Sequence, residues 1–496
     1  MATLLLAAAG SAVGGLFGST AAILGQAAGA LAGNLIDRAL FGARGTTEVG
    51  RLADLDVQTS AEGAAIPRVF GRVRIAGQVI WATRFEEESR SESVGGKGGG
   101  AKVKTFSYYA NFAVGLSEGP IAHVGRVWAN GKLLDLDRVA MHVHLGDEAQ
   151  EPDSLILARQ GESPAYRGLA YVVFERLPLD AFGNALPQLS FEVIRPVGRL
   201  ERMIRAVTLI PGATEFGYAT TEVTAEPWRG AVAAENRHAA TAATDVGAAL
   251  DELFALAPNL ESVAVVVTWF GDDLRAGHCT LRPKVERDDK TTRPWSWSVA
   301  GLTRTSAGVV SAVASAPAFG GTPDDTSVVQ LIEALKARGV AVTFYPFVMM
   351  DVPAGNDLPD PWGGNGQPVY PWRGRITCTP APGRPGSPDG SAAAEAEIAA
   401  LVGTAAVADH TVSGGRVTYS GPAEWTLRRM VLHYAHLCLA AGGVESFLVG
   451  SELVGLTRVR GAGRSYPFVA ALRALAADVK AVLGTGTAVG YAADWS

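Results

Sequence analysis

Five carboxylates in the C-terminal half of the chain directly follow runs of residues that predict β-strands. They are Asp272, Asp273, Asp351, Glu452 and Asp494. Parallel strands present their carboxyl ends at one edge of a sheet, which is the functional face of a βα-barrel. Two carboxylates that face each other across a cleft can hydrolyse a glycosidic bond, because one protonates the leaving oxygen while the other attacks or activates water. Acidic residues in these positions also cap the next helix or are simply solvated, so both interpretations stay open.

The segments that would position these carboxylates alternate between strand and helix. A polar, Ala-rich stretch at 234–256 predicts a helical connector, and the apolar run at 262–270 is typical of a strand buried on both faces. Helices and strands then alternate, at 327–338, 340–348, 425–441, 446–452, 467–483 and 487–494. This order predicts a parallel α/β sheet. Four such strands make half of an eight-fold barrel, so we expect the α/β domain, residues 231–496, to be incomplete within this sequence.

Insertions rich in Gly, Pro and Trp separate these strands. They lie at 274–326, with Trp295 and Trp297, and at 357–366 and 380–387. Exposed aromatic side chains on such loops suit either stacking on sugars or contact with a neighbouring subunit. We favour subunit contact and keep sugar stacking as the alternative.

Histidine and cysteine, the usual metal ligands, give no metal-site pattern. The three cysteines are Cys279, Cys378 and Cys438. They are far apart and form no CxxC pair, which argues against a disulfide framework or a zinc site. Two histidine pairs have strand or helix spacing, His142/His144 and His433/His436. Neither pair has a third ligand nearby in sequence, so we expect no metal and no cofactor.

The composition indicates an ordered protein of two or three domains. The chain has 496 residues, of which 48% are hydrophobic and 19% charged, and its net charge is -6. A dedicated nucleic-acid binder normally has a basic excess, so tight DNA binding is disfavoured. A protein that only lines a passage for DNA should hold phosphates weakly, and the mildly acidic net charge is compatible with such a role. Arg68, Arg72 and Arg74 could form a basic stripe, but such residues more often lie on a solvated strand face.

The first residues of the chain carry a regular glycine pattern. Met1 to Ile36 contain no charged side chain, and the glycines recur four residues apart, at Gly10, Gly14, Gly18, Gly25, Gly29 and Gly33. This spacing gives one helix face without side chains, so that neighbouring helices can approach closely. We expect residues 1–45 to form a glycine-zipper helix that self-associates within an assembly. A signal peptide and a permanent membrane anchor are the alternatives, although no basic residue precedes Arg38.

From about residue 46 to 230 the sequence predicts short strands and turns. Residues 66–81 alternate as a half-buried hairpin would, Asn130-Gly131 is a hairpin turn signal, and the run 95–100 predicts a flexible tip. Four segments follow one another here: "PRVFGRVRIAGQVIWAT", "GGKGGG", "SYYANFAVGLSEGPIAHVGRVWANGKLL" and "YRGLAYVVFERLPLDAFGNALPQLSFEV". The set resembles the tail-tip, host-specificity proteins of long-tailed phages and, most of all, the large hub protein of gene transfer agents, phage-derived particles that carry host DNA between bacteria.

This resemblance implies β-rich hub domains that assemble as a ring, expected to be a trimer, around a tail channel. The partners would be sister chains, other hub and distal tail proteins, and the host envelope or its surface polysaccharide, with DNA passing through without sequence-specific binding. The location would be the tip of a phage-like tail, assembled in the bacterial cytoplasm. The N-terminal helix would close the channel or enter a membrane during delivery.

The C-terminal segments "FLVGSEL" and "YAADWS" resemble the barrel-like domain of the same hub protein, which is itself similar to glycoside hydrolases. In many of those enzymes an Asn-Glu pair ends a strand and the Glu is the acid/base. By resemblance Glu452 would be that residue and Asp494 the second catalytic candidate, but Ser451 replaces the Asn. A structural hub subunit is therefore our leading hypothesis, and a tail-associated glycosidase is the runner-up. A membrane-anchored binding protein of the cell itself is the third.

Overall fold

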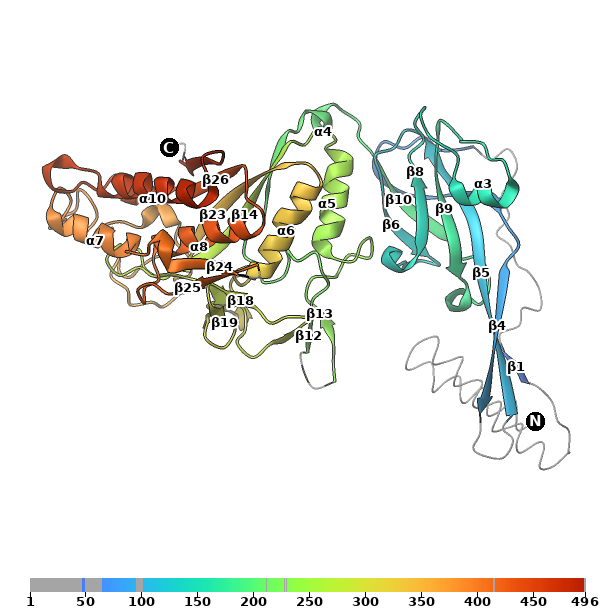
Figure 1. The fold of residues 1–496 in the computed structure, drawn as a ribbon, viewed down its shortest axis with the longest axis horizontal. Coiled ribbons are helices and arrows are strands. Elements are labelled where there is room, and N and C mark those ends of the chain that lie inside the picture. Colours follow the sequence, from blue (N-terminus) through green and yellow to red (C-terminus); the bar gives the residue numbers. More distant parts are fainter. Residues whose placement is uncertain are drawn as a thin grey trace. The chain divides into compact units, whose positions relative to one another are not determined.

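The computed structural model describes residues 47–49, 65–94, 101–210, 212–226, 228, 230–413 and 415–494. These residues form two compact units, one within residues 1–199 and 240–242, the other within 200–239 and 243–496 (Figure 1). The predicted N-terminal helix and the predicted flexible tip at 95–100 lie outside the described residues. Within the ranges given above, no helix is both long and apolar enough to span a membrane.

The described residues of the first unit form two β-sheets and one short α-helix, α3 (Ser154–Gln160). Its strands are β1 (Thr47–Val49), β2 (Gly71–Ala76), β3 (Gln78–Ala82), β4 (Glu86–Val94), β5 (Ala101–Glu118), β6 (His123–Ala129), β7 (Lys132–Leu133), β8 (Ala140–His144), β9 (Leu169–Pro178) and β10 (Leu189–Arg195). One sheet has the order β1-β5-β9-β8, with β3 and β4 also on β5, and the other has the order β2-β10-β6-β7. Phe112, Phe174 and Phe191 are fully buried in one core cluster to which strands of both sheets contribute. The β-rich character expected of this region is present.

The predicted hairpin at 66–81 is wrong, because its two strands belong to different sheets. β2 pairs with β10, whereas β3 pairs with β5. Gly77 lies at the crossing, where a Cβ atom would overlap the side chain of Val114 and lie 3.1 Å from the carbonyl oxygen of Gly115. The absent side chain of glycine allows the chain to pass from one sheet to the other, and Val73, an apolar residue of the expected alternation, is exposed. The turn at Asn130-Gly131, in contrast, joins β6 to β7 with both residues at positive φ.

The second unit is organised around a parallel sheet with the order β11-β14-β23-β26-β27. These strands are β11 (Ala206–Leu209), β14 (Ser262–Gly271), β23 (Ala341–Met350), β26 (Ser446–Ser451) and β27 (Ala488–Ala492). The α-helices are α4 (Leu200–Met203), α5 (Asp245–Leu256), α6 (Asp325–Ala337), α7 (Ala392–Val402), α8 (Leu427–Ala440), α9 (Val454–Thr457) and α10 (Pro467–Leu483). All four adjacent strand pairs are parallel, which confirms the prediction from alternating strands and helices.

Short strands and hairpins fill the connections between these elements. They are β12 (Thr224–Glu226), β13 (Ala233–Ala234), β15 (Leu281–Arg282), β16 (Lys284–Val285), β17 (Thr291–Arg293), β18 (Ser298–Val299), β19 (Leu302–Thr303), β20 (Gly308–Val309), β21 (Ala312–Val313), β22 (Ala316–Pro317), β24 (His410–Ser413) and β25 (Arg416–Tyr419). Most of them lie between β14 and α6, within the insertion predicted at 274–326.

The start of the second unit differs from the prediction in two ways. β11 adds a fifth parallel strand, so the structure divides the chain near residue 200 and not after residue 230. The predicted helical connector at 234–256 begins only at Asp245, after its N-cap Thr244. The residues before it are held as an irregular loop, because the buried amide of Asn236 bonds to the backbone of Ala219, Thr221 and Val223.

The two faces of the parallel sheet are covered unequally. On one face, Trp269 of β14 is fully buried and donates a hydrogen bond from Nε1 to the hydroxyl of Tyr434 in α8, 2.8 Å away. On the other face, the residues of β23 that alternate with its buried ones, among them Tyr345 and Phe347, are only half-buried. Figure 1 shows α8 and α10 running alongside the sheet. The less covered face and the carboxyl edge of the sheet are therefore where the chain can meet a ligand.

Candidate functional site

All five sequence-predicted carboxylates lie at carboxyl ends of the parallel strands. β14 ends at Gly271, β23 at Met350, β26 at Ser451 and β27 at Ala492. This placement confirms the strand boundaries on which the sequence argument rested. The carboxylates do not share one cleft, however, since each group has its own set of partners.

Asp272 and Asp273, which follow β14, hold the insertion that begins there. Asp272 accepts hydrogen bonds from the amide and the hydroxyl of Thr280, at 2.7 and 2.6 Å. Asp273 is 4% exposed and accepts from Nη2 of Arg275 at 2.6 Å and from Nε2 of Gln367 at 2.6 Å. Burial raises the pKa of Asp273, but the hydrogen bonds, those of Arg275 foremost, outweigh it and the net pKa is lowered. These contacts are structural.

Asp351, which follows β23, is also enclosed by an insertion. Its Oδ2 lies 2.6 Å from Nζ of Lys284 and accepts from the amide of Ser311 at 3.1 Å. The side chain is 1% exposed. A carboxylate that is paired and enclosed in this way cannot reach a substrate, so Asp351 fits an anchoring role for the insertion.

Glu452 is the carboxylate that remains accessible. Its side chain is 38% exposed, and its Oε2 lies 2.8 Å from Nη2 of Arg373. The same oxygen accepts a hydrogen bond from Nε1 of Trp372 at 2.9 Å. Arg373 and Trp372 both come from the loop after β23, about 80 residues away in sequence. Arg373 and Trp372 thus hold the same oxygen of Glu452 from one loop.

The backbone at the end of β26 explains how Glu452 is aimed. The register between β26 and β27 shifts between Leu448 and Ser451, as at a β-bulge. Glu452 then adopts a left-handed conformation with φ 51°, and its amide donates to the carbonyl of Ala492 at 2.8 Å. A non-glycine residue in this region is strained by about 1 kcal/mol. The strand geometry thus turns the side chain of Glu452 out of the regular alternation.

Arg373 connects Glu452 to the less covered face of the sheet. Its side chain is 7% exposed, and Nε donates to the carbonyl of Ser451 at 3.0 Å. The guanidinium lies 3.8 Å from the ring centroid of Phe347. Burial lowers the pKa of Arg373, while the charge of Glu452 acts in the opposite direction. Nothing in the local sequence around Arg373 and Trp372 signals a partner at the end of β26.

Tyr491 brings the two predicted catalytic residues into one neighbourhood. Its hydroxyl accepts a hydrogen bond from the amide of Leu453 at 2.6 Å. Burial raises the pKa of Tyr491, and the charges of Asp494 and Glu452 act in the same direction. Glu452 and Asp494 are therefore close enough to influence one phenol. Ser451, which replaces the Asn of the glycosidase pattern, is 2% exposed with its hydroxyl enclosed, so it does not face this surface.

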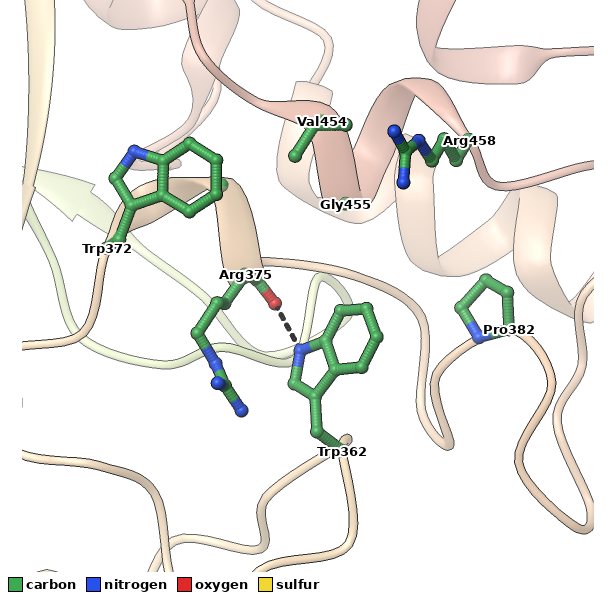
Figure 2. A pocket seen from close by; sticks show the side chains of 8 residues that line it. Trp362, Trp372, Arg375, Pro382, Val454, Gly455 and Arg458 are labelled. Carbon is green, nitrogen blue, oxygen red and sulfur yellow. Dashed lines mark hydrogen bonds between the residues drawn. The ribbon is translucent and has the colours of Figure 1, made fainter. Parts of the chain in front are cut away.

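A pocket of about 320 Å³ lies next to Trp372, which donates to Glu452 (Figure 2). It is lined by Trp362, Trp372, Gly374, Arg375, Pro382, Val454, Gly455 and Arg458. These residues come from the insertion after β23 and from α9, which directly follows Glu452. Trp372 belongs both to the pocket and to the contacts of Glu452, so the two features form one site.

The other predicted candidates have structural surroundings. Trp297 is 1% exposed and offers no face to sugar, whereas Trp295 is partly buried and donates to Asp324 at 2.9 Å. His142 and His144 both contact Oδ2 of Asp153, at 2.8 and 3.0 Å. Arg72 pairs with Glu192 and Arg74 packs over Trp128, as on an ordinary strand face. Among the residues that the structure describes, no group of three or more His, Cys, Asp or Glu side chains could hold a metal ion.

Comparisons with known proteins agree with the resemblance drawn from the sequence. Residues 425–496, which span α8 to β27 and include Glu452 and Asp494, match the family of the GTA TIM-barrel-like domain, where GTA denotes gene transfer agent. A chain of the solved "virion of native gene transfer agent (GTA) particle" is 41% identical over 42% of this chain and 44% of that chain, with a TM-score of 0.25. Similarity to a gene transfer agent protein with a TIM-barrel-like domain is thereby confirmed. The matched part covers less than half of either chain.

Two structures of glycoside hydrolases also show similarity. They are described as a complex structure and a structure of GH113 β-1,4-mannanase, each 17% identical over 47% of this chain and 44% of that chain, with TM-scores of 0.22 and 0.21. These scores are too low to support an argument about fold or activity. No curated protein matches the chain.

Proposed function

We propose, from the premise that residues 425–496 belong to the gene transfer agent TIM-barrel-like family, that this chain is a structural subunit of a phage-like particle. The observation that carries the proposal is the 41% identity to a chain of a native gene transfer agent virion. More specifically, the chain would be a hub subunit at the tail tip. It would assemble with copies of itself into a ring, expected to be a trimer, and contact other hub and distal tail proteins.

The domain arrangement fits this role. The β-rich unit, within residues 1–199, would form the ring around a DNA channel, and the net charge of -6 suits a wall that does not retain DNA. The glycine-patterned residues 1–45 would plug that channel and enter the envelope on delivery. The TIM-barrel-like unit would face outward, toward the envelope or its polysaccharide.

The proposal is tested in a producing bacterium by replacing this chain with an epitope-tagged version and by deleting it. We expect labelled antibody at the tail tip, and we expect the deletion to abolish DNA transfer while heads still fill. Cryo-electron microscopy of the tail would give the ring symmetry. Label on the head, or normal transfer by particles that lack the chain, would rule the hub role out.

A tail-associated glycoside hydrolase with Glu452 as acid/base and Asp494 as its partner is the second candidate. Its support is the half-exposed carboxylate of Glu452 beside an aromatic pocket. If the site is catalytic, Glu452→Gln should lower release of reducing ends from bacterial surface glycans by about 10²–10⁴-fold. Glu333→Gln on the exposed side of α6 is the matched control. Equal release by both variants and the unaltered chain would exclude Glu452 catalysis.

A membrane-anchored binding protein of the cell itself makes a different prediction. The full chain, expressed without any other particle protein, would then sediment with membranes through residues 1–45. Under the hub proposal, the chain reaches an envelope only as part of an assembled particle, so the chain expressed alone should not sediment with membranes. Fractionation of cells with and without the particle genes separates the two.

A further inference from the structure

We propose that the pocket beside Glu452 binds one sugar unit that carries a negative charge, a carboxylate or a phosphate, within a cell-surface glycan. The inference deepens the envelope-contact part of the proposed function and rests on it only for the source of the ligand. It is carried by three features of the lining: fixed aromatic faces, a floor that requires glycine, and an uncompensated positive charge.

Two tryptophans provide the aromatic faces, and both are held through their indole N–H groups. Nε1 of Trp362 donates to the carbonyl of Arg375 at 2.9 Å (Figure 2). Nε1 of Trp372 donates to Glu452 at 2.9 Å. Since the polar edge of each ring is used by the protein, the ring faces are what a ligand meets. Trp372 is 43% exposed. Such fixed rings suit the C–H faces of a sugar.

The floor of the pocket depends on two glycines. A Cβ atom at Gly374 would overlap the ring of Trp372, and a Cβ atom at Gly455 would overlap the carbonyl oxygen of Ile376. These positions let α9 approach the loop at 373–376 and let the ring of Trp372 lie over that loop. The shape is thus built by close backbone packing, and it is small enough for one sugar ring.

The charge of the lining is positive. The pocket is lined by Arg375 and Arg458, and none of its eight lining residues is acidic. Arg458 is exposed, and its guanidinium has no hydrogen-bond or ion-pair partner among the described residues. Arg375 lies 3.8 Å from Asp360, and its Nε atom is buried without a hydrogen-bond partner. The nearby Glu452 is already paired with Arg373. A carboxylate or phosphate would pair with the exposed guanidinium of Arg458.

A neighbouring protein subunit is the alternative occupant that the loop composition first suggested. A subunit contact would be expected to use a broad exposed surface, whereas these rings and the guanidinium of Arg458 converge on one enclosed volume. The location next to the half-exposed Glu452 also favours a small ligand. We therefore commit to the anionic sugar.

The test is binding of defined oligosaccharides to the full-length chain, measured by titration calorimetry. The probes are an oligogalacturonate for the carboxylate, a mannose-6-phosphate-bearing oligosaccharide for the phosphate, and an uncharged manno-oligosaccharide. We expect at least one anionic probe to bind and the uncharged probe to bind at least roughly tenfold more weakly. Arg458→Ala and Trp362→Ala should each weaken the anionic probe about tenfold, and Trp362→Phe, which keeps a ring, should weaken it less.

Matched controls lie elsewhere in the same unit. Trp228→Ala removes a tryptophan that is 72% exposed on the loop between β12 and β13, and Arg416→Ala removes an exposed arginine of β25. Neither should change binding. Equal affinity for charged and uncharged probes, no binding of either, or no effect of Trp362→Ala on a bound probe would overturn the proposal.

The subunit alternative has its own outcome. If oligomer formation protects Trp362 from oxidation by N-bromosuccinimide, the pocket is a subunit contact and the sugar proposal is wrong. The position of the chain in the particle is measured separately by antibody label. If no sugar binds but the antibody labels the tail tip, the hub proposal stands and the sugar proposal is wrong. If the antibody does not label the tail tip, the measured sugar binding is unaffected.

Discussion

Glu192, in the middle of β10, has a side chain that is 6% exposed and faces two arginines. Nη2 of Arg126 lies 2.8 Å from one oxygen, and Nη1 of Arg72 lies 3.3 Å from the same oxygen. Hydrogen bonds from Arg126 are the main reason that the pKa of Glu192 falls to about 2, against an ordinary value of 4.5. The carboxylate therefore links three strands of one sheet, β2, β6 and β10.

The lowered pKa makes the stability of the first unit dependent on pH in acid. A group whose pKa is lower in the folded than in the unfolded chain stabilises the fold above the unfolded value and loses that effect as pH falls. The contribution of Glu192 should thus be complete above about pH 4.5 and be lost toward about pH 2. Glu192→Gln should cost on the order of 2 kcal/mol at pH 7, since Arg126 is half exposed.

Calorimetric unfolding of the full chain from pH 7 to pH 2.5 measures this effect. At pH 7 the unfolding midpoint of Glu192→Gln should lie below that of the unaltered chain. The two midpoints should converge as pH falls. Glu118→Gln, whose partner Arg68 is 3.4 Å away on an exposed surface, is the control and should change little. A constant difference across the whole pH range would contradict the assignment to Glu192.

The candidate site was predictable only in part at this scale. Asp273 and Glu452 could be placed at strand ends from the apolar runs before them, because strand periodicity is a local property. The same sequence could not tell that Asp273 is enclosed by Gln367 whereas Glu452 stays half exposed. Those differences arise from loops that lie about 80 or more residues away in sequence and have no periodic pattern.

The insertion after β14 is anchored by a buried ion pair. Arg304 binds Glu215 through two hydrogen bonds, at 2.9 and 2.6 Å, and the two side chains are 6% and 2% exposed. Lys290 approaches the same carboxylate at 3.1 Å. Burial raises the pKa of Glu215, but its hydrogen bond from Arg304 and the nearby positive charges outweigh burial and lower it. This pair fixes the insertion to the loop between β11 and β12.

Removing one partner should therefore be costly. Arg304→Met leaves a buried carboxylate with only Lys290 to compensate it, and should reduce stability by about 3–5 kcal/mol. The matched control is Arg205→Met, which breaks a pair with Glu261 of similar length, 2.8 Å, whose members are 58% and 68% exposed. That change should cost about 0–1 kcal/mol. Urea unfolding of both variants measures the difference, and equal losses would show that burial does not set the strength of the pair.

The crossing at Gly77 allows a second test at the scale of elements. Gly77→Ala places a methyl group against Val114 and should destabilise the first unit by about 1–3 kcal/mol through overpacking. Val114→Ala should recover part of that loss in the double variant. Gly486→Ala is the control, because a Cβ atom there would meet nothing within 4 Å. Thermal unfolding of the unaltered chain, the two single variants at Gly77 and Val114, and the double variant measures the coupling between the two positions. Strictly additive losses of stability would contradict the steric explanation.

The helices and strands that the sequence predicted between residues 262 and 494 agree with the structure to within a few residues. The apolar run at 262–270 became β14, and the amphipathic pattern at 467–483 became α10, because both are periodic over their whole length. Prediction failed where a side chain overrides the pattern. Asn236 holds a loop where alanines favour helix, and Gly77 separates two strands whose alternation is continuous.

At the scale of the whole molecule, several motifs in the same order along the chain indicated the class of protein better than any single residue did. Motifs of strand and turn residues indicate a fold, and residues 425–496 match the model of the GTA TIM-barrel-like domain. Sequence could not give the division near residue 200, since β11 is four residues long and joins its sheet through a parallel partner more than fifty residues away. The glycine pattern of residues 1–45 lies outside the described structure, so its role stays a prediction.

That role can be tested in the assembled particle. If the glycines at spacing four form a contact face between sister helices, Gly14→Leu and Gly29→Leu should prevent close approach and reduce DNA transfer at least tenfold, while tail assembly is unchanged. Ala12→Leu and Ala27→Leu, two residues before the glycines and so on a different face of a helix, are matched controls that should transfer normally. Gene-transfer frequency and particle counts by electron microscopy give the two readouts. Because a helix face is the physical basis of the pattern, equal loss for the alanine and glycine positions would show that general hydrophobicity, and not glycine spacing, governs this segment.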